Sequence, residues 1–193
     1  MDRNRDLFWE LLEPEHLRVR AFCRKLAGNR EDGDDLCQEA LVQAFTRFAS
    51  LREPDRFKAW LYRIVVNRYR NHCRRPLWQR LVPTASDSGP HAAGADPAGN
   101  HGARRLIERA FRAVSPADRA LITLFETEGW KVAELACMLG KSETAIKVRL
   151  CRIRRKMRDT LTRYLARDEN PRKVAIVTKE DAYALSRSRT SLD

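Results

Sequence analysis

The chain has 193 residues and a formal net charge of +12 at pH 7. This length suits one domain or two small ones, and so basic a balance favours a polyanionic partner such as nucleic acid. No stretch approaches the ~20 apolar residues that span a bilayer, and the charged opening MDRNRD is unlike a signal peptide, so we expect a cytoplasmic protein with no direct membrane insertion.

The N-terminal part of the chain, residues 1–75, is predicted to consist of helices. One helix is expected to end at Gly28, which can take the left-handed conformation, and Asp32 suits the N-cap of the next helix. Pro54 is expected to open a third helix. The positions that follow the helical period are Cys37, Leu41, Ala44 and Phe48 in the second helix, and Phe57, Trp60, Leu61, Ile64 and Arg68 in the third.

An acidic segment, DDLCQE over residues 34–39, stands near the start of the second of these helices. Acids at a helix N-terminus suit the helix dipole, which accounts well for Asp34 and Asp35 but less well for Gln38 and Glu39. The alternative is a docking surface for a basic protein partner. The residues alone leave both interpretations open.

A basic stripe follows in the third helix. Arg63, Asn67, Arg70 and Arg74 recur at i, i+4, i+7 and i+11, and three aromatic residues are interleaved with them: Trp60, Tyr62 and Tyr69. Cations that hold phosphates beside aromatics that stack on unpaired bases are typical of single-strand binders. The alternative is a set of solvated arginines beside core aromatics. We favour the core for Trp60 and nucleic acid for the stripe.

Residues 76–103 interrupt this pattern and are expected to form a flexible linker. They hold four of the eight prolines and four of the eight glycines, and residues 86–102 lack any large apolar residue. Such a segment buries too little surface to offset the entropy of ordering it. The composition therefore predicts two small helical domains on either side of a linker.

The second domain is predicted to contain a helix-turn-helix. Ser115 and Pro116 form a helix start, Gly129 a stop and Gly140 a left-handed turn, after which Ser142 suits an N-cap. In the helix that follows, Ile146, Leu150, Ile153 and Met157 share a face, while Thr144, Lys147, Val148, Cys151 and Arg155 share the open one. The second helix of such a motif enters the DNA major groove.

The alternative for this segment is an ordinary surface hairpin of helices with a solvated charged face. A solvated face usually mixes signs. Residues 147–158 instead hold seven basic residues and no acid, which favours the DNA-binding interpretation.

Together these motifs resemble the extracytoplasmic-function group of bacterial RNA polymerase sigma factors. The similarity covers residues 7–165 and rests on DDLCQE, FKAWLYRIVVN, SPADRALI and LGKSETAIKVRL in that order. The resemblance implies that one set of residues docks on the clamp helices of the polymerase's largest subunit: Asp35, Leu36, Gln38 and Glu39. It also implies core RNA polymerase and promoter DNA as partners, with a probable anti-sigma factor.

The resemblance assigns the DNA contacts as well. The residues implied to open and read the minus-ten element are Arg63, Asn67, Arg68 and Arg70, and the basic stripe of the third helix adds Arg74. The residues implied to read the minus-thirty-five element are Ser142, Glu143, Thr144, Lys147, Val148, Arg149, Cys151 and Arg152, and the open face of the second helix of the helix-turn-helix adds Arg155.

Three residues depart from the family pattern. Lys131 replaces the Ser or Thr that usually caps the first helix of the helix-turn-helix, and packing of Trp130 is expected to compensate. Val148 replaces a hydroxyl on the open face, where it suits contact with a thymine methyl. Cys151 stands where His is frequent, so the promoter sequence does not transfer from relatives.

The sequence thus predicts an all-α protein with a docking and minus-ten domain at 1–75, a linker at 76–103, a helix-turn-helix domain at 104–167 and a tail at 168–193 that is either disordered or a regulatory arm. We expect a sigma factor that is not an enzyme; the alternative is a stand-alone helix-turn-helix regulator. No Gly-rich phosphate loop or nucleophile beside a base is evident. Five scattered cysteines and four histidines lack metal-ligand spacing, so free thiols and no cofactor are expected.

Overall fold

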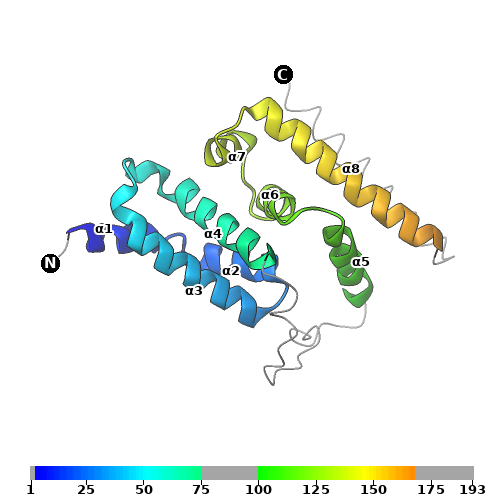
Figure 1. Ribbon diagram of the computed structural model, residues 1–193, viewed down its shortest axis with the longest axis horizontal. Coiled ribbons are helices and arrows are strands. Elements are labelled where there is room, and N and C mark those ends of the chain that lie inside the picture. The colour runs from blue at the N-terminus through cyan, green and yellow to red at the C-terminus, as the bar shows by residue number, and fades with distance from the viewer. Residues whose placement is uncertain (1–2, 75–99, 168–193) are drawn as a thin grey trace. The chain divides into compact units, whose positions relative to one another are not determined.

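A computed structural model describes residues 3–74 and 100–167 of the chain, and within these ranges every regular element is helical. The predicted all-α class is therefore confirmed. Most of the predicted linker and the whole tail from residue 168 lie outside the described residues. The elements in chain order are α1 Arg3–Leu12, α2 His16–Ala27, α3 Arg30–Arg47, η1 Phe48–Ser50, η2 Pro54–Arg56, α4 Phe57–Arg74, α5 Asn100–Arg112, α6 Pro116–Glu126, α7 Val132–Leu139 and α8 Glu143–Arg167 (Figure 1).

The described helices divide into two compact units. The first comprises α1 to α4, α6, α7 and the start of α8 up to Leu150, and the second comprises α5 and α8 from Cys151 onward. The first unit thus joins elements from both sides of the predicted linker. The domain boundaries at residues 75 and 104 stay predictions.

The ends of the N-terminal helices follow the sequence signals with one correction. Gly28 ends α2 with φ +83°, as predicted, and its N–H donates to the Arg24 carbonyl at 2.9 Å. The N-cap of α3 is Asn29, whose Oδ1 accepts the Asp32 N–H at 2.8 Å, so the expected Asp32 cap is wrong. Pro54 opens the short η2 turn, which leads into α4.

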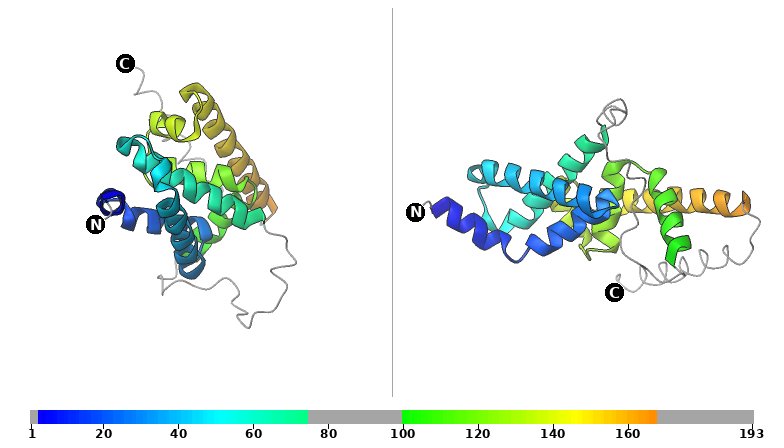
Figure 2. Two further views of the ribbon diagram at one scale, coloured as in Figure 1. Left: turned by 60° about the vertical axis from the view of Figure 1, so that its left-hand side comes forward. Right: turned by 90° about the horizontal axis from the view of Figure 1, so that it is seen from below.

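Three helices, α2, α3 and α4, pack side by side and enclose the N-terminal core (Figures 1 and 2). Its fully buried side chains include Val19 and Phe22 of α2, Ala40 of α3, and Leu61 and Val65 of α4. Helix α1 closes one end with Phe8, whose ring makes edge-on contacts with three further rings, those of Phe45, Phe48 and Phe57. Apolar burial of this extent is what holds small helical bundles together.

The helix-turn-helix forms where the sequence predicts it. Gly140 takes φ +62° after α7, and the Ser142 hydroxyl accepts the Ala145 N–H at 3.2 Å at the start of α8. Ile146 and Leu150 are buried, as is Ile153 further along α8. The predicted buried face of the second helix is therefore confirmed at these three positions.

The first helix of the motif, α7, begins without a side-chain cap at Lys131. A lysine side chain has no acceptor, so only the reciprocal bond forms, from the Lys131 N–H to the Glu134 carboxylate at 2.7 Å. Trp130 is 3% exposed, and its ring centroid lies 4.8 Å from that of Tyr62. Packing of Trp130 therefore accompanies the missing cap, as expected from the sequence.

Candidate docking and nucleic-acid surfaces

The acidic segment of α3 separates into a structural carboxylate and an exposed face. Arg20 and Arg24 each bind Asp34 through two hydrogen bonds of 2.7–2.9 Å. These bonds, first that from Arg20 and then that from Arg24, hold the pKa of Asp34 well below its usual range. Asp34 therefore ties α3 to α2.

The remaining polar residues of the segment, Asp35, Gln38 and Glu39, are exposed. Helix α3 begins at Arg30, so these residues lie beyond its first turn. The helix dipole acts mainly within that turn. A favourable interaction with the helix dipole is therefore expected for Glu31 more than for these three residues. Asp35, Gln38 and Glu39 instead form a polar face that is open to a partner.

Leu36 belongs to the core. It is only 6% exposed and points into the bundle. Its side chain is therefore not part of the exposed face, and the docking role that the resemblance implies for it stays a prediction. Leu36 anchors α3 in the core.

An apolar patch extends the polar face. Trp9 of α1, Val42 and Phe45 are 54%, 67% and 46% exposed, and the Trp9 and Phe45 rings lie 6.3 Å apart. Val42 follows Glu39 by three residues and Phe45 follows Gln38 by seven, so both continue the same side of α3. We call Asp35, Gln38, Glu39, Val42, Phe45 and Trp9 the α3 face.

The apolar half of the α3 face is not predicted from the sequence. Val42 and Phe45 can be recognised as exposed apolar residues only after the buried face of α3 has been assigned, because they lie outside that face. Trp9 comes from another helix and has no periodic relation to them.

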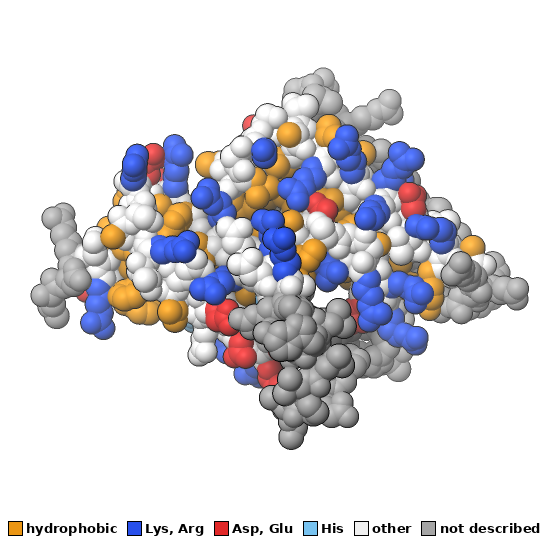
Figure 3. Space-filling view, viewed as in Figure 1, with side chains coloured by type: hydrophobic (Ala, Val, Ile, Leu, Met, Phe, Trp, Pro, Cys, Tyr) orange, Lys and Arg blue, Asp and Glu red, His pale blue; other side chains and the backbone are white. Residues whose placement is uncertain are grey.

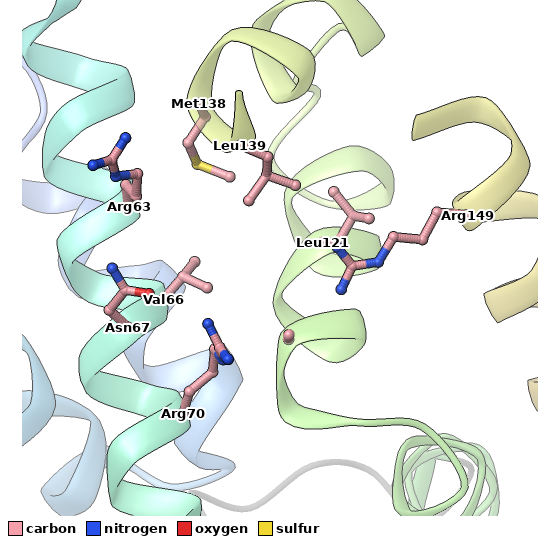
Figure 4. Close-up of a pocket in the computed structure, with 9 residues that line it drawn as sticks. Arg63, Val66, Asn67, Arg70, Leu121, Met138, Leu139 and Arg149 are labelled. Carbon is pink, nitrogen blue, oxygen red and sulfur yellow. The ribbon is translucent and has the colours of Figure 1, made fainter. Parts of the chain in front are cut away.

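The cationic stripe of α4 is exposed, as the period predicts. Arg63, Asn67 and Arg70 line a cavity of about 210 Å³, as does Val66 (Figure 4). The cavity's other lining residues are Ala117 and Leu121 of α6, Met138 and Leu139 of α7, and Arg149 of α8. Arg74, the last residue of α4, is exposed too. We call Arg63, Asn67, Arg70 and Arg74 the α4 stripe.

The aromatic residues interleaved with the α4 stripe do not form a stacking surface. Tyr62 and Tyr69 are 1% and 4% exposed, and burial raises the pKa of Tyr69 to about 12. Trp60 is half-buried against Phe57, with ring centroids 5.9 Å apart. The core interpretation of Trp60 is supported, and the stacking role expected of the two tyrosines is wrong in this structure.

Arg68 lies apart from the α4 stripe. Its guanidinium donates to the Gln43 side-chain oxygen and lies 3.8 Å from the Glu39 carboxylate. Arg68 therefore faces α3, where it borders the polar end of the α3 face. The minus-ten contact that the resemblance implies for Arg68 stays a prediction.

The open face of α8 carries the residues expected to meet DNA. Thr144, Lys147 and Val148 are exposed near its start, and Val148 is 44% exposed. The other exposed residues assigned to this surface are Ser142, Glu143, Cys151, Arg152 and Arg155. Helix α8 is long enough for base contacts near its start and phosphate contacts beyond.

Arg149 differs from these neighbours, because its Nε donates to Asp118 of α6 at 2.8 Å. Its side chain is 38% exposed. The ion pair holds α8 on α6, a role that the sequence does not reveal because the partners stand far apart in the chain. Arg149 therefore contributes to fixing the reading helix.

Positive charge dominates the surface in one view. Figure 3 shows Lys and Arg side chains spread widely over this face, with fewer Asp and Glu. Among the described residues, no group of three His, Cys, Asp or Glu side chains is placed to hold a metal ion. No described helix is long and apolar enough to cross a membrane.

Two family models match the chain in the order of these surfaces. Sigma-70 region 2 matches residues 11–79, which include α3 and α4, and Sigma-70, region 4 matches residues 104–157, which include the helix-turn-helix. This order, on an all-α chain with a cationic stripe and a reading helix, defines a sigma-factor architecture. The chain belongs to the extracytoplasmic-function group of RNA polymerase sigma factors.

Individual relatives agree with this assignment. The extracytoplasmic-function sigma factor SigE of Mycolicibacterium smegmatis is 29% identical over 162 residues, which cover 81% of this chain and 62% of SigE. SigG of Mycobacterium tuberculosis is 30% identical over 178 residues, which cover 79% of this chain and 48% of SigG. The chain thus spans about half to three-fifths of the length of these two relatives.

A solved structure shares the fold. The sigma factor RpoE of Bartonella quintana, in complex with the anti-sigma factor NepR, matches with a TM-score of 0.60 at 22% identity. The match covers 80% of this chain and 96% of RpoE. At this identity, the likeness is one of fold.

Proposed function

We propose that the protein directs core RNA polymerase to specific promoters and helps to open the DNA for transcription initiation. The observation that carries the proposal is the pairing of two surfaces on adjacent helices: the exposed α3 face and the cationic α4 stripe. The same chain also carries a basic reading helix. A regulator that binds duplex DNA alone needs the reading helix but neither of the other surfaces.

The α3 face is proposed to dock on the core enzyme. Asp35 and Glu39 supply negative charge, which steers a basic partner and fixes its orientation. Val42, Phe45 and Trp9 supply apolar area of the kind that carries binding energy once water is excluded. A mixed face of this kind suits a partner surface with a basic rim and an apolar centre.

The α4 stripe and α8 are proposed to divide the promoter between them. Arg63, Asn67 and Arg70 hold the backbone of the minus-ten non-template strand, while Lys147 and Val148 read base edges of the minus-thirty-five element. Phosphate contacts supply most of the affinity and base contacts the specificity. Because Tyr62 and Tyr69 are buried, capture of unpaired bases is assigned to groups other than these two rings.

The family assignment adds further proposals. Residues 1–75 and 104–167 act as separate domains, and the protein works in the cytoplasm as a polymerase subunit with no catalytic activity of its own. An anti-sigma factor is proposed as its antagonist, since the solved sigma factor with the same fold is bound to one.

The test compares promoter binding with and without core polymerase. A labelled promoter duplex is titrated with the full chain, with core enzyme, and with both, and anisotropy is recorded at fixed salt. We expect sequence-specific binding only when both are present. Equal specificity from the chain alone would favour the stand-alone regulator and contradict the proposal.

A further inference from the structure

Two cysteines meet inside the N-terminal bundle, away from the α4 stripe. Cys23 of α2 is 0% exposed and Cys37 of α3 is 3% exposed. The two thiols interact, and each is the largest cause of the shift in the other's pKa. Neither side chain contributes to the surfaces assigned to polymerase or DNA.

Helices α2 and α3 approach each other unusually closely at this level. A Cβ on Gly33 would lie 2.5 Å from the Arg24 Cα, so the two backbones touch and only glycine fits there. Packed helices are usually 8–10 Å apart, roughly, between axes. Cys37 lies one turn beyond Gly33 on the same side of α3, and Cys23 adjoins Arg24, so the pair sits beside this backbone contact.

A disulfide requires two Cα atoms about 4.4–6.8 Å apart. Side chains that face each other across ordinary helix pairs are often too distant for this. The backbone contact between Gly33 and Arg24, which lies beside both cysteines, indicates that Cys23 and Cys37 meet the requirement with little movement.

The surroundings of the pair distinguish the two sulfurs. The interaction with Cys23 is the main reason that the pKa of Cys37 is lowered; burial and the Asp34 charge oppose it, and the charges of Arg20 and Arg24 act with it. The same interaction, followed by burial, raises the pKa of Cys23. Cys37 is thus the better thiolate of the pair and Cys23 the proton holder, and the thiolate is the form that reacts.

We propose that Cys23 and Cys37 form a reversible intramolecular disulfide when the chain meets a small hydroperoxide. The Cys37 thiolate attacks one peroxide oxygen, an S–O bond forms, the O–O bond breaks, and the departing hydroxide takes up a proton to become water. The Cys23 sulfur then attacks the Cys37 sulfenic acid, an S–S bond forms, and water leaves with the Cys23 proton. Two thiols are oxidised and hydrogen peroxide is reduced to two waters.

The oxidant is small because both sulfurs are buried. A hydroperoxide reaches them through local opening of the helix pair, whereas a bulky disulfide does not. The product ties α2 to the helix that carries Asp35 and Glu39. This proposal does not depend on the proposed function, because it concerns only the chemistry of the folded chain.

The experiment treats the full chain with hydrogen peroxide in native buffer, blocks the remaining thiols and maps tryptic peptides without reduction. Trypsin releases Cys23 in residues 21–24 and Cys37 in residues 31–47, so a linked pair is unambiguous. We expect this link in monomeric protein, a loss of two hydrogens in the intact mass, and full reversal by dithiothreitol. The closed loop should also raise the melting temperature by several degrees.

The matched controls use a chain with Cys73→Ser, Cys137→Ser and Cys151→Ser, which keeps only the proposed pair. Adding Cys23→Ser or Cys37→Ser to it should abolish both the mass loss and the rise in melting temperature. Wild-type peptide mapping needs no variant, so a substitution that fails to fold leaves the proposal testable. Cys23 and Cys37 that stay alkylatable while the exposed cysteines oxidise would overturn it, as would a link that forms only in urea.

Discussion

At the scale of single residues, Asp34 shows how one carboxylate organises a helix pair. Two bidentate arginines from α2 bind it, which keeps it ionised in the folded chain. Such charge-assisted pairs are geometrically specific. Asp34 therefore belongs to the framework that holds α3 in place, whereas its neighbour Asp35 is free to face a partner.

The lowered pKa of Asp34 predicts how stability changes with acid. The charged form stabilises the fold at every pH above the unfolded carboxyl value of about 3.9, and this contribution is lost as pH falls through the lower folded value. Asp34→Asn should therefore unfold at lower urea than wild type at pH 7, and the difference should shrink between about pH 4 and pH 2. Urea midpoints from circular dichroism at pH 7, 4, 3 and 2 measure it. A difference that stays constant across this range would contradict the prediction.

Val148 is the second residue with a specific prediction, because it is apolar and exposed on a basic reading face. We expect it to contact the 5-methyl group of one promoter thymine. Replacing that thymine by deoxyuridine should weaken wild-type binding by about 0.8 kcal/mol, or roughly fourfold, for one buried methyl. Val148→Ser should bind thymine and deoxyuridine promoters equally. A fourfold loss that persists in Val148→Ser would assign the methyl contact to another residue.

At the scale of elements, α8 should divide base contacts from phosphate contacts along its length. Lys147→Ala should cost ~1–3 kcal/mol and relax preference at one promoter position. Arg155→Ala should weaken binding to all sequences alike and reduce the salt slope by about one unit. Affinities for single-base promoter variants at several salt concentrations separate the two. If the roles are exchanged, the orientation assigned to α8 is wrong.

The sequence predicts most of the helices because their ends carry local signals. Gly28 and Gly140 end helices, and Ser142 caps one, at the positions that the sequence predicts. The α3 cap is an exception, because Asn29 and Asp32 are both good N-cap residues three positions apart, and local chemistry does not choose between them.

The parts of the site that depend on distant partners were harder to predict. Arg149 faces Asp118, which stands 31 residues away in the chain, and Arg68 faces Gln43 across a helix pair. Helical periodicity places such residues on a face but does not reveal what the face meets. For the same reason, helical periodicity does not predict that Trp9 lies beside Phe45, because this contact follows only from the packing of α1.

At the scale of the whole molecule, polymerase docking and DNA binding are assigned to different surfaces. Asp35→Ala with Glu39→Ala should weaken binding to core polymerase by about tenfold, because both carboxylates are exposed and charge complementarity is lost. Non-specific binding of the full-length double variant to duplex DNA should not change, because neither residue belongs to the α4 stripe or to α8. The control Glu53→Ala with Asp55→Ala removes the same charge near η2 and should leave core affinity intact. If a pull-down titration shows that both double variants lose the same affinity for core polymerase, the docking role of the α3 face is contradicted.

Run-off transcription measures whether the chain directs core polymerase to promoters. Purified core polymerase is incubated with a genomic promoter library, with and without the full chain, and transcript starts are sequenced. We expect a set of starts that requires both components, shares minus-ten and minus-thirty-five elements, and is lost with Arg63→Ala and Arg70→Ala. Starts that are the same without the chain, or that the chain only represses, would contradict it.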